Sequence, residues 1–169
     1  ITFAGDRTIL GDRLPKFYGG LQNNFTFKNW SLGFLIQFVK QEDLNYLNTV
    51  FTPVGGLSNF DESVLDYWQQ PGDETIYSKP TTQPNGPFYN SLSSSNNWED
   101  ASYIKLRNVN LSYNLPVAWV SKVGMQNARV YFQGQNLITI TSYTGLDPET
   151  KSTFAPPLRT LSLGLQANF

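Results

Sequence analysis

Carboxylate side chains are the groups of this chain best suited to acid–base chemistry, because the sequence contains no histidine and no cysteine. That composition excludes a Ser-His-Asp triad, a thiolate nucleophile, an imidazole or thiolate zinc site and a disulfide framework. A glycosidase needs two carboxyl groups about 5–9 Å apart across the sugar, a spacing that neighbouring loop residues do not specify. We therefore expect solvated loop charges, no catalytic residue and no enzymatic activity from Asp61-Glu62 with Asp66, Asp73-Glu74, Glu99-Asp100, and Asp147 with Glu149.

Metal and cofactor binding have little support in the sequence. Loop carboxylates could hold Ca²⁺, but the spaced ligands of an EF-hand are absent. The glycines show no phosphate-loop spacing followed by Lys and Ser or Thr. We expect no metal and no cofactor, with a loop Ca²⁺ site as the open alternative. The formal net charge of -1 also argues against a nucleic-acid partner, which needs a basic surface.

Two tryptophans in the long polar segment 41–100 are candidates for contacting a ligand or a partner protein. Trp68 and Trp98 are each flanked by polar residues. An exposed indole can stack on a sugar face or pack on a lid protein. The alternative is that a large ordered loop buries its own aromatic side chains.

Alternation of apolar and polar residues is the dominant pattern of the chain and predicts β-strands. In one window Trp30, Leu32, Phe34, Ile36 and Phe38 form an uninterrupted apolar face. Pro116 ends another window, since proline cannot donate to a strand ladder. The predicted strands lie near 20–28, 30–40, 102–115, 127–139 and 158–169.

The lengths of the connections favour an outer-membrane barrel. A two-residue turn at 28–29 and a short connection at 116–127 alternate with long connections at 41–100 and 141–157. Outer-membrane barrels combine short periplasmic turns with long outer loops. The sequence therefore predicts an all-β fold, an antiparallel transmembrane β-barrel segment of five or six strands with 41–100 extracellular and the C-terminus periplasmic. The predicted inner strand ends carry the aromatic residues expected of a membrane girdle: Phe27, Trp30, Tyr113 and Phe169.

The polar faces of these strands would line a water-filled lumen. A cation such as Arg129 usually needs a partner in a lumen. The alternative role for these polar side chains is simple hydration of the inner wall. Lys105 and Arg107 share the parity of the apolar face, so either they lie among headgroups or a β-bulge changes the phase. The candidate lumen-facing residues are Asn108, Asn110, Ser112, Asn114, Arg129, Gln133 and Gln135.

Several segments, in order, resemble the SusC-like TonB-dependent receptors of the outer membrane. The longest is Ser102–Pro116, which reads SYIKLRNVNLSYNLP. The others are Gly11–Pro15, Gly19–Leu21 with the hairpin through Leu32, Trp68 with Pro71–Asp73, Arg129–Phe132, Gly134–Leu137, Tyr143–Glu149 and Pro157–Leu161 through Gly164-Leu165 to Phe169.

This resemblance places residues 1–169 at the C-terminal end of a plugged barrel of about 22 strands. It implies a Gram-negative outer-membrane protein that imports oligosaccharides or peptides with a SusD-like surface lipoprotein. The plug and the segment that contacts TonB would lie in the rest of the receptor. The resemblance also implies that Phe169 is the signal read by the barrel-assembly machinery.

Two other classes of protein stay open. A soluble β-sandwich that binds carbohydrate would also have strands, turns and exposed aromatic residues. A hydrolase using the loop carboxylates is the third reading. The edges of the sheet distinguish a sandwich from a barrel segment, because only the barrel segment leaves both edges for other strands.

Overall fold

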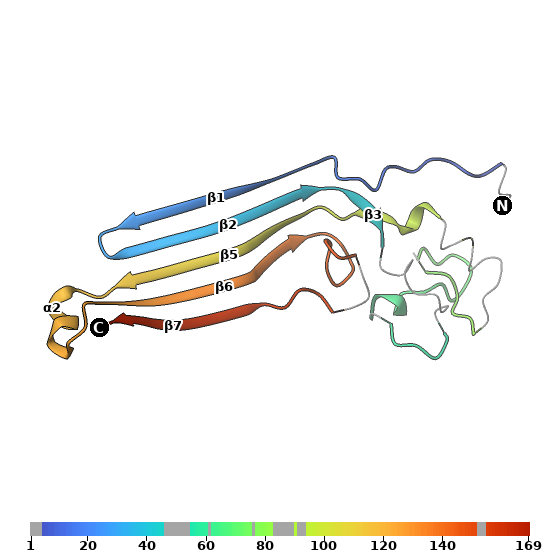
Figure 1. Cartoon of the computed structure of the whole chain (residues 1–169). Coiled ribbons are helices and arrows are strands. Elements are labelled where there is room, and N and C mark those ends of the chain that lie inside the picture. The colour runs from blue at the N-terminus through green and yellow to red at the C-terminus, as the bar shows by residue number, and fades with distance from the viewer. Residues whose placement is uncertain are drawn as a thin grey trace.

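The computed structural model describes residues 5–45, 55–60, 62–75, 77–82, 90, 94–151 and 155–169. Its main feature is a five-stranded antiparallel sheet with the strand order β1-β2-β5-β6-β7 (Figure 1). The strands are long, and sequence neighbours lie side by side. Their bounds are β1 Phe17–Phe27, β2 Trp30–Lys40, β5 Tyr103–Asn114, β6 Asn127–Thr141 and β7 Thr160–Asn168.

The β1–β2 hairpin closes through the two residues Lys28 and Asn29, and Phe27 pairs with Trp30. Lys28 has φ 52°, the left-handed conformation that a tight hairpin turn requires. β1 begins at Phe17, before the expected start near residue 20. This earlier part of the strand is accommodated because Gly19 leaves room for the ring of Phe38 on β2.

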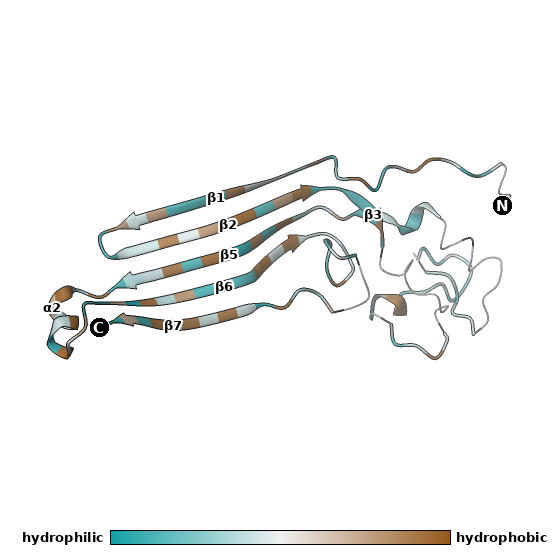
Figure 2. Ribbon diagram, viewed as in Figure 1, coloured by the Kyte–Doolittle hydropathy of each residue, from teal (hydrophilic) through white to brown (hydrophobic). Residues whose placement is uncertain are grey.

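The two faces of the sheet differ in polarity, as the alternating colours along each strand show (Figure 2). On one face Leu32, Leu111, Phe132 and Leu163 are cross-strand neighbours from β2 to β7. These apolar side chains are not packed into a core: Leu163 is 78% exposed. Within the described residues no second sheet covers either face, so this part of the chain does not have the two packed layers of a β-sandwich.

A β-bulge at Arg107 changes the phase of β5. Leu35 pairs with Asn108, but the next residue, Ile36, pairs with Leu106, so Arg107 is an extra residue in the strand. The bulge places Lys105 on the polar face, opposite Gln37. The alternative that a β-bulge changes the phase near Lys105 and Arg107 is therefore confirmed.

β6 is irregular opposite the same bulge. Leu106 pairs with Ile138, whereas Asn108 pairs with Gln135, so β6 also has residues outside the regular ladder. Asn136 has φ 52°, a conformation that Asn tolerates better than most residues. The apolar face consequently continues without interruption through Ile138.

The segment 41–100, expected to be one loop, contains a short ladder that holds its two ends together. β3 (Glu42–Leu44) pairs with β4 (Trp98–Asp100) as a separate two-stranded sheet beyond the end of β2. Between them the structure describes two 3-10 turns, η2 (Glu62–Leu65) and η3 (Ser95–Asn97).

The connection between β5 and β6 contains a short helix. α2 (Val117–Val120) follows Pro116 and continues into the 3-10 turn η4 (Ser121–Val123). Gly124, with φ 75°, ends the turn in the left-handed conformation. α2 lies at the same end of the sheet as the β1–β2 turn and the last residue of the chain (Figure 1).

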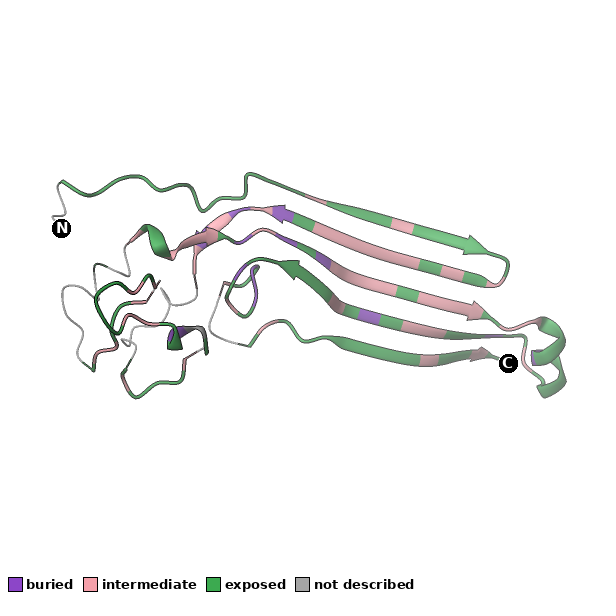
Figure 3. Cartoon of the chain, turned by 180° about the vertical axis from the view of Figure 1, so that it is seen from behind, coloured by how far each residue is buried: buried purple, intermediate pink, exposed green. Residues whose placement is uncertain are grey.

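Most buried residues gather at the opposite end of the sheet, beside β3 and the segment that follows β6 (Figure 3). They include Val39, Ala101, Tyr103 and Tyr143. Among the described residues, no helix has the length and apolar character needed to span a bilayer.

Candidate functional site

Rows of amide and hydroxyl groups cross the polar face of the sheet, which makes this face the main candidate for contact with a solute. In one row Asn110 of β5 lies beside Gln133 of β6, which lies beside Ser162 of β7. In the adjoining row Asn108 of β5 pairs with Gln135 of β6, which pairs with Thr160 of β7. These groups both donate and accept hydrogen bonds and carry no charge.

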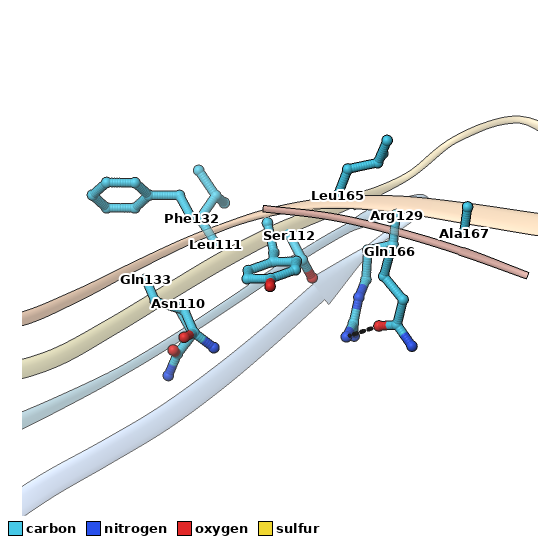
Figure 4. A pocket seen from close by; sticks show the side chains of 10 residues that line it. Asn110, Leu111, Ser112, Arg129, Phe132, Gln133, Leu165, Gln166 and Ala167 are labelled. Carbon is cyan, nitrogen blue, oxygen red and sulfur yellow. Dashed lines mark hydrogen bonds between the residues drawn. The ribbon is translucent and has the colours of Figure 1, made fainter. Parts of the chain in front are cut away.

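A shallow, open groove of about 620 Å³ runs along this face, formed by β5, β6 and β7. Figure 4 shows the polar side chains of Asn110, Gln133 and Gln166 on one side of the sheet. Phe132 and Leu165 point to the other side. Ser162 and Gln166 also lie on this face but are absent from the residues predicted to face the lumen, although their alternation along β7 is a sequence signal for that face.

Arg129 is the cation of this groove, and its contacts are with neutral groups. Its Nη2 donates a hydrogen bond of 2.8 Å to Oε1 of Gln166 (Figure 4). Its Cζ lies 5.9 Å from the ring centroid of Tyr131. No carboxylate in the described part of the chain forms an ion pair with Arg129, so the guanidinium can still receive an acceptor from a solute or from a neighbouring part of the protein.

The structure places the remaining lumen candidates on the same face. Asn114 pairs with Arg129, and its backbone N–H donates to the carbonyl of Asn29 at 2.9 Å. Ser112 pairs with Tyr131, whose ring occupies the space above Gly164. All seven candidates of the sequence analysis thus come together on one polar surface, whereas contact of that surface with a lumen stays a prediction.

A charged cluster stands at one end of the polar face; we call Lys105, Arg107, Asp147 and Glu149 the Lys105 cluster. Lys105 Nζ lies 2.6 Å from Asp147 Oδ2 and 3.0 Å from Glu149 Oε2. Arg107 pairs with Glu149 and donates a 2.6 Å hydrogen bond to Oε1 of Gln37. Lys105 and Asp147 are only 3% and 5% exposed, so the interpretation of Asp147 as a solvated loop charge is wrong.

Asp147 also organises the backbone of the turn in which it lies. Its Oδ1 accepts hydrogen bonds from the N–H groups of Glu149 at 2.9 Å and Thr150 at 3.0 Å. Burial alone would raise the pKa of the Asp147 carboxyl, but these donors and Lys105 hold it below its ordinary value. The same balance, with Arg107 and Lys105 as donors, lowers the pKa of Glu149.

A second buried carboxylate joins this turn to β3. Asp43 is 1% exposed and lies 2.6 Å from Nε of Arg13 and 2.5 Å from Nζ of Lys151. The side-chain amide of Gln41 donates to the carbonyls of Ala101 at 3.1 Å and Pro148 at 2.9 Å. Segment 142–151 is therefore fastened across the end of the sheet by buried polar contacts.

The two tryptophan candidates have different environments, and both are half-buried. Nε1 of Trp98 donates to Oε2 of Glu42 at 3.2 Å, and its ring fills the space beside Gly11. Trp68 is anchored through its backbone N–H, which donates to the carbonyl of Tyr77 at 2.9 Å. Trp98 thus contributes to packing within the chain, while contact of either residue with a ligand or partner stays a prediction.

The aromatic residues expected at one end of the strands are neighbours in the sheet. The rings of Trp30 and Tyr113 are 4.6 Å apart between centroids, and Phe27 pairs with Trp30. Phe169 follows β7 at the same end and is 78% exposed. In the residues that the structure describes, no group of three or more acidic side chains is placed to hold a metal ion. Asp61 lies outside those residues.

Comparison with known proteins identifies relatives of the whole segment. No protein-family model matches the chain. TonB-dependent receptor P3 of Formosa agariphila is 34% identical over 147 residues, which cover 86% of this chain and 14% of that receptor. This chain is homologous to a segment of TonB-dependent receptors. The segment spans about a seventh of the length of that relative.

A second relative supports the same assignment of this receptor segment. TonB-dependent receptor P26 of Formosa agariphila is 29% identical over an alignment that covers 100% of the segment and 18% of the receptor. The sequence resemblance to TonB-dependent receptors is thereby confirmed. These relatives are named as receptors, not as enzymes.

Solved structures confirm the fold of the receptor segment. The RagAB peptide importer in its open-open state matches 95% of the segment and 18% of its own chain, with a TM-score of 0.71 and 27% identity. The closed-closed state matches the same shares with a TM-score of 0.69 and 26% identity. The expected antiparallel β-barrel segment is thereby confirmed. Its sheet is not closed within this segment.

Proposed function

We propose that this receptor segment forms the C-terminal part of the barrel wall of a TonB-dependent importer in the Gram-negative outer membrane. The supporting observation is the two-faced sheet: large exposed apolar side chains cover one face, and amide and hydroxyl groups cover the other. The apolar face would contact lipid, and the polar face would line the lumen. The homologous receptors support the same role.

The rest of the same receptor is the first proposed partner. In the described segments, the outer edges of β1 and β7 pair with no strand. Unpaired backbone N–H and C=O groups cost several kcal/mol each in hydrocarbon, so each edge must continue into a further strand. With this arrangement, 41–100 is extracellular, the last residue is periplasmic, and Phe169 is the proposed assembly signal.

The proposed cargo is an oligosaccharide or a peptide, captured with a SusD-like surface lipoprotein. The neutral hydrogen-bonding rows of the polar face suit both classes of solute. A solute would bind between the outer loops and the lipoprotein and would cross the lumen after the plug moves. Energy would come from TonB through another part of the receptor. This role uses no catalytic residue, no metal and no cofactor in the segment.

Two measurements on cells test the proposal. The intact polypeptide should have a mass several times the 19.1 kDa of this segment and should leave the outer membrane only with detergent. A detergent-independent 19.1 kDa monomer would contradict the proposal. Cells with and without the gene are then given a labelled peptide mixture or a neutral oligosaccharide. Uptake of one class should require the gene and should be lost with an uncoupler.

A further inference from the structure

The connection between β5 and β6 exposes apolar side chains that the strands do not account for. Val117 and Trp119 of α2 are 71% and 63% exposed, and Val123 of η4 is 63% exposed. A short connection in water would be expected to carry polar residues. Three large exposed apolar side chains in seven residues therefore indicate a non-aqueous neighbour.

The position of α2 joins this surface to the apolar face of the sheet. α2 contacts β6, and each element has a buried apolar residue: Val120 of α2 is 3% exposed and Ala128 of β6 is 4% exposed. Ala128 has the same parity on β6 as Val130 and Phe132, so it belongs to the apolar face. The helix thus packs against the end of that face and extends it beyond the strands.

The side chains of α2 and η4 match the chemistry of a membrane surface. Trp119 of α2 and Val123 of η4 are both large apolar side chains and are equally exposed, at 63%. Tryptophan is enriched at membrane–water interfaces, where its ring meets acyl chains and its N–H meets water and headgroups. Lys122 is exposed and can reach a lipid phosphate. Phe27 ends β1 and Trp30 begins β2, and the turn between these strands lies at the same end of the sheet as α2 (Figure 1).

We infer that α2 and η4 lie in the headgroup layer of the periplasmic leaflet, with Trp119 and Val123 in contact with phospholipid. This inference rests on the proposed barrel wall and adds a surface anchor outside the strands. A folded connection at this depth would fix how far the β5–β6 hairpin enters the bilayer. The strand register alone does not set that depth.

Nitroxide quenching in the full receptor tests the contact. The receptor, with any other cysteine replaced by serine, carries a single fluorophore at Trp119→Cys and is reconstituted in phosphatidylcholine vesicles. The vesicles contain nitroxide either on the headgroup or at mid-chain. Two matched sites serve as references: Leu163→Cys on the apolar face of β7, and Lys28→Cys in the polar β1–β2 turn at the same end of the sheet.

The label at position 119 should lose more fluorescence with the headgroup nitroxide than with the mid-chain nitroxide, and more than the label at position 28. The label at position 163 should be quenched most by the mid-chain nitroxide. Quenching at 163 without quenching at 119 would overturn the anchor alone and would indicate that α2 faces water or a periplasmic protein. Absence of quenching at both positions would overturn the proposed wall as well.

Discussion

Single residues of the Lys105 cluster bind segment 142–151 to the sheet. Lys105 and Asp147 have both lost most of their hydration, and their 2.6 Å contact compensates for that loss. Removing one partner of such a pair leaves the other charge buried and unpaired, which costs more than the pair contributes. The cluster is therefore the place where a single substitution should act most strongly on the segment.

Lys105→Met should loosen segment 142–151 by about 3 kcal/mol, because Asp147 would keep its burial and lose its cation. The measurement is limited proteolysis of the full receptor within this segment. Lys40→Met is the matched control, since Lys40 and Asp100 form an exposed pair at 2.7 Å. The control should change the stability by less than about 1 kcal/mol. Equal protection in both variants would contradict the structural role of Lys105.

Acid should release the same segment. The pKa values of Asp147 and Glu149 are lowered from 3.8 and 4.5 in the folded protein. A lowered carboxyl pKa stabilises the folded state fully above the unfolded-state value, and this stabilisation is lost as pH falls through the folded-state value. Proteolysis of segment 142–151 by an acid-active protease should therefore rise only below about pH 4. Release that begins at neutral pH would argue against these carboxylates as the fastening groups.

The residue types alone did not reveal this cluster. Asp147 and Glu149 are close in sequence and look like an ordinary loop pair, whereas their cations lie in β5. The contact depends on the bulge that moves Lys105 to the polar face. The parity anomaly of Lys105 and Arg107 was the only sequence signal, and it left two placements open.

At the level of elements, Arg107 keeps the two faces of β5 consistent. The side chains of a strand alternate with period two, so adding or removing one residue moves all later side chains to the opposite face. Without the bulge, Lys105 would lie on the apolar face and Leu106 on the polar face. The extra residue thus preserves an apolar wall through Ile104.

Deletion of Arg107 should abolish assembly of the full receptor, because the outer part of β5 would present a charge to the hydrocarbon. Arg107→Gln is the matched control: it keeps the residue count and removes the cation. The measurement is the amount of heat-modifiable receptor in the outer membrane. Normal assembly of the deletion variant would show that the strand can shift its register without cost.

The five long strands were predictable because alternation is a local property of each strand. β3, β4 and α2 were missed for a different reason. The β3–β4 ladder joins residues that are far apart in sequence, and its three-residue strands are too short for a periodic signal. α2 spans only Val117–Val120, about one turn, so helical periodicity cannot emerge.

For the whole molecule, the difference between the two faces decides what the sheet can contact. The rows of amide and hydroxyl groups can face water, while the row that ends in Leu163 cannot be hydrated favourably over its full length. Contact of the apolar face with lipid and of the polar face with water would satisfy the hydration requirement of each face. The alternation that predicted the strands also predicted this division, although the closure of the wall depends on strands of the receptor beyond this segment.

A lysine introduced on the apolar face and one introduced on the polar face should have different effects on the receptor, because the two faces have different environments. Leu163 and Ser162 are adjacent in β7, one on the apolar face and one in the polar row. Leu163→Lys should destabilise the assembled receptor by about 2–4 kcal/mol, the cost of a lysine near the middle of the bilayer. Ser162→Lys should be tolerated, because its ammonium would remain in water. Heat-modifiable receptor in the outer membrane, compared between the two variants, measures the difference. Equal loss would contradict the assignment of the apolar face to lipid, and a greater loss for Ser162→Lys would reverse it.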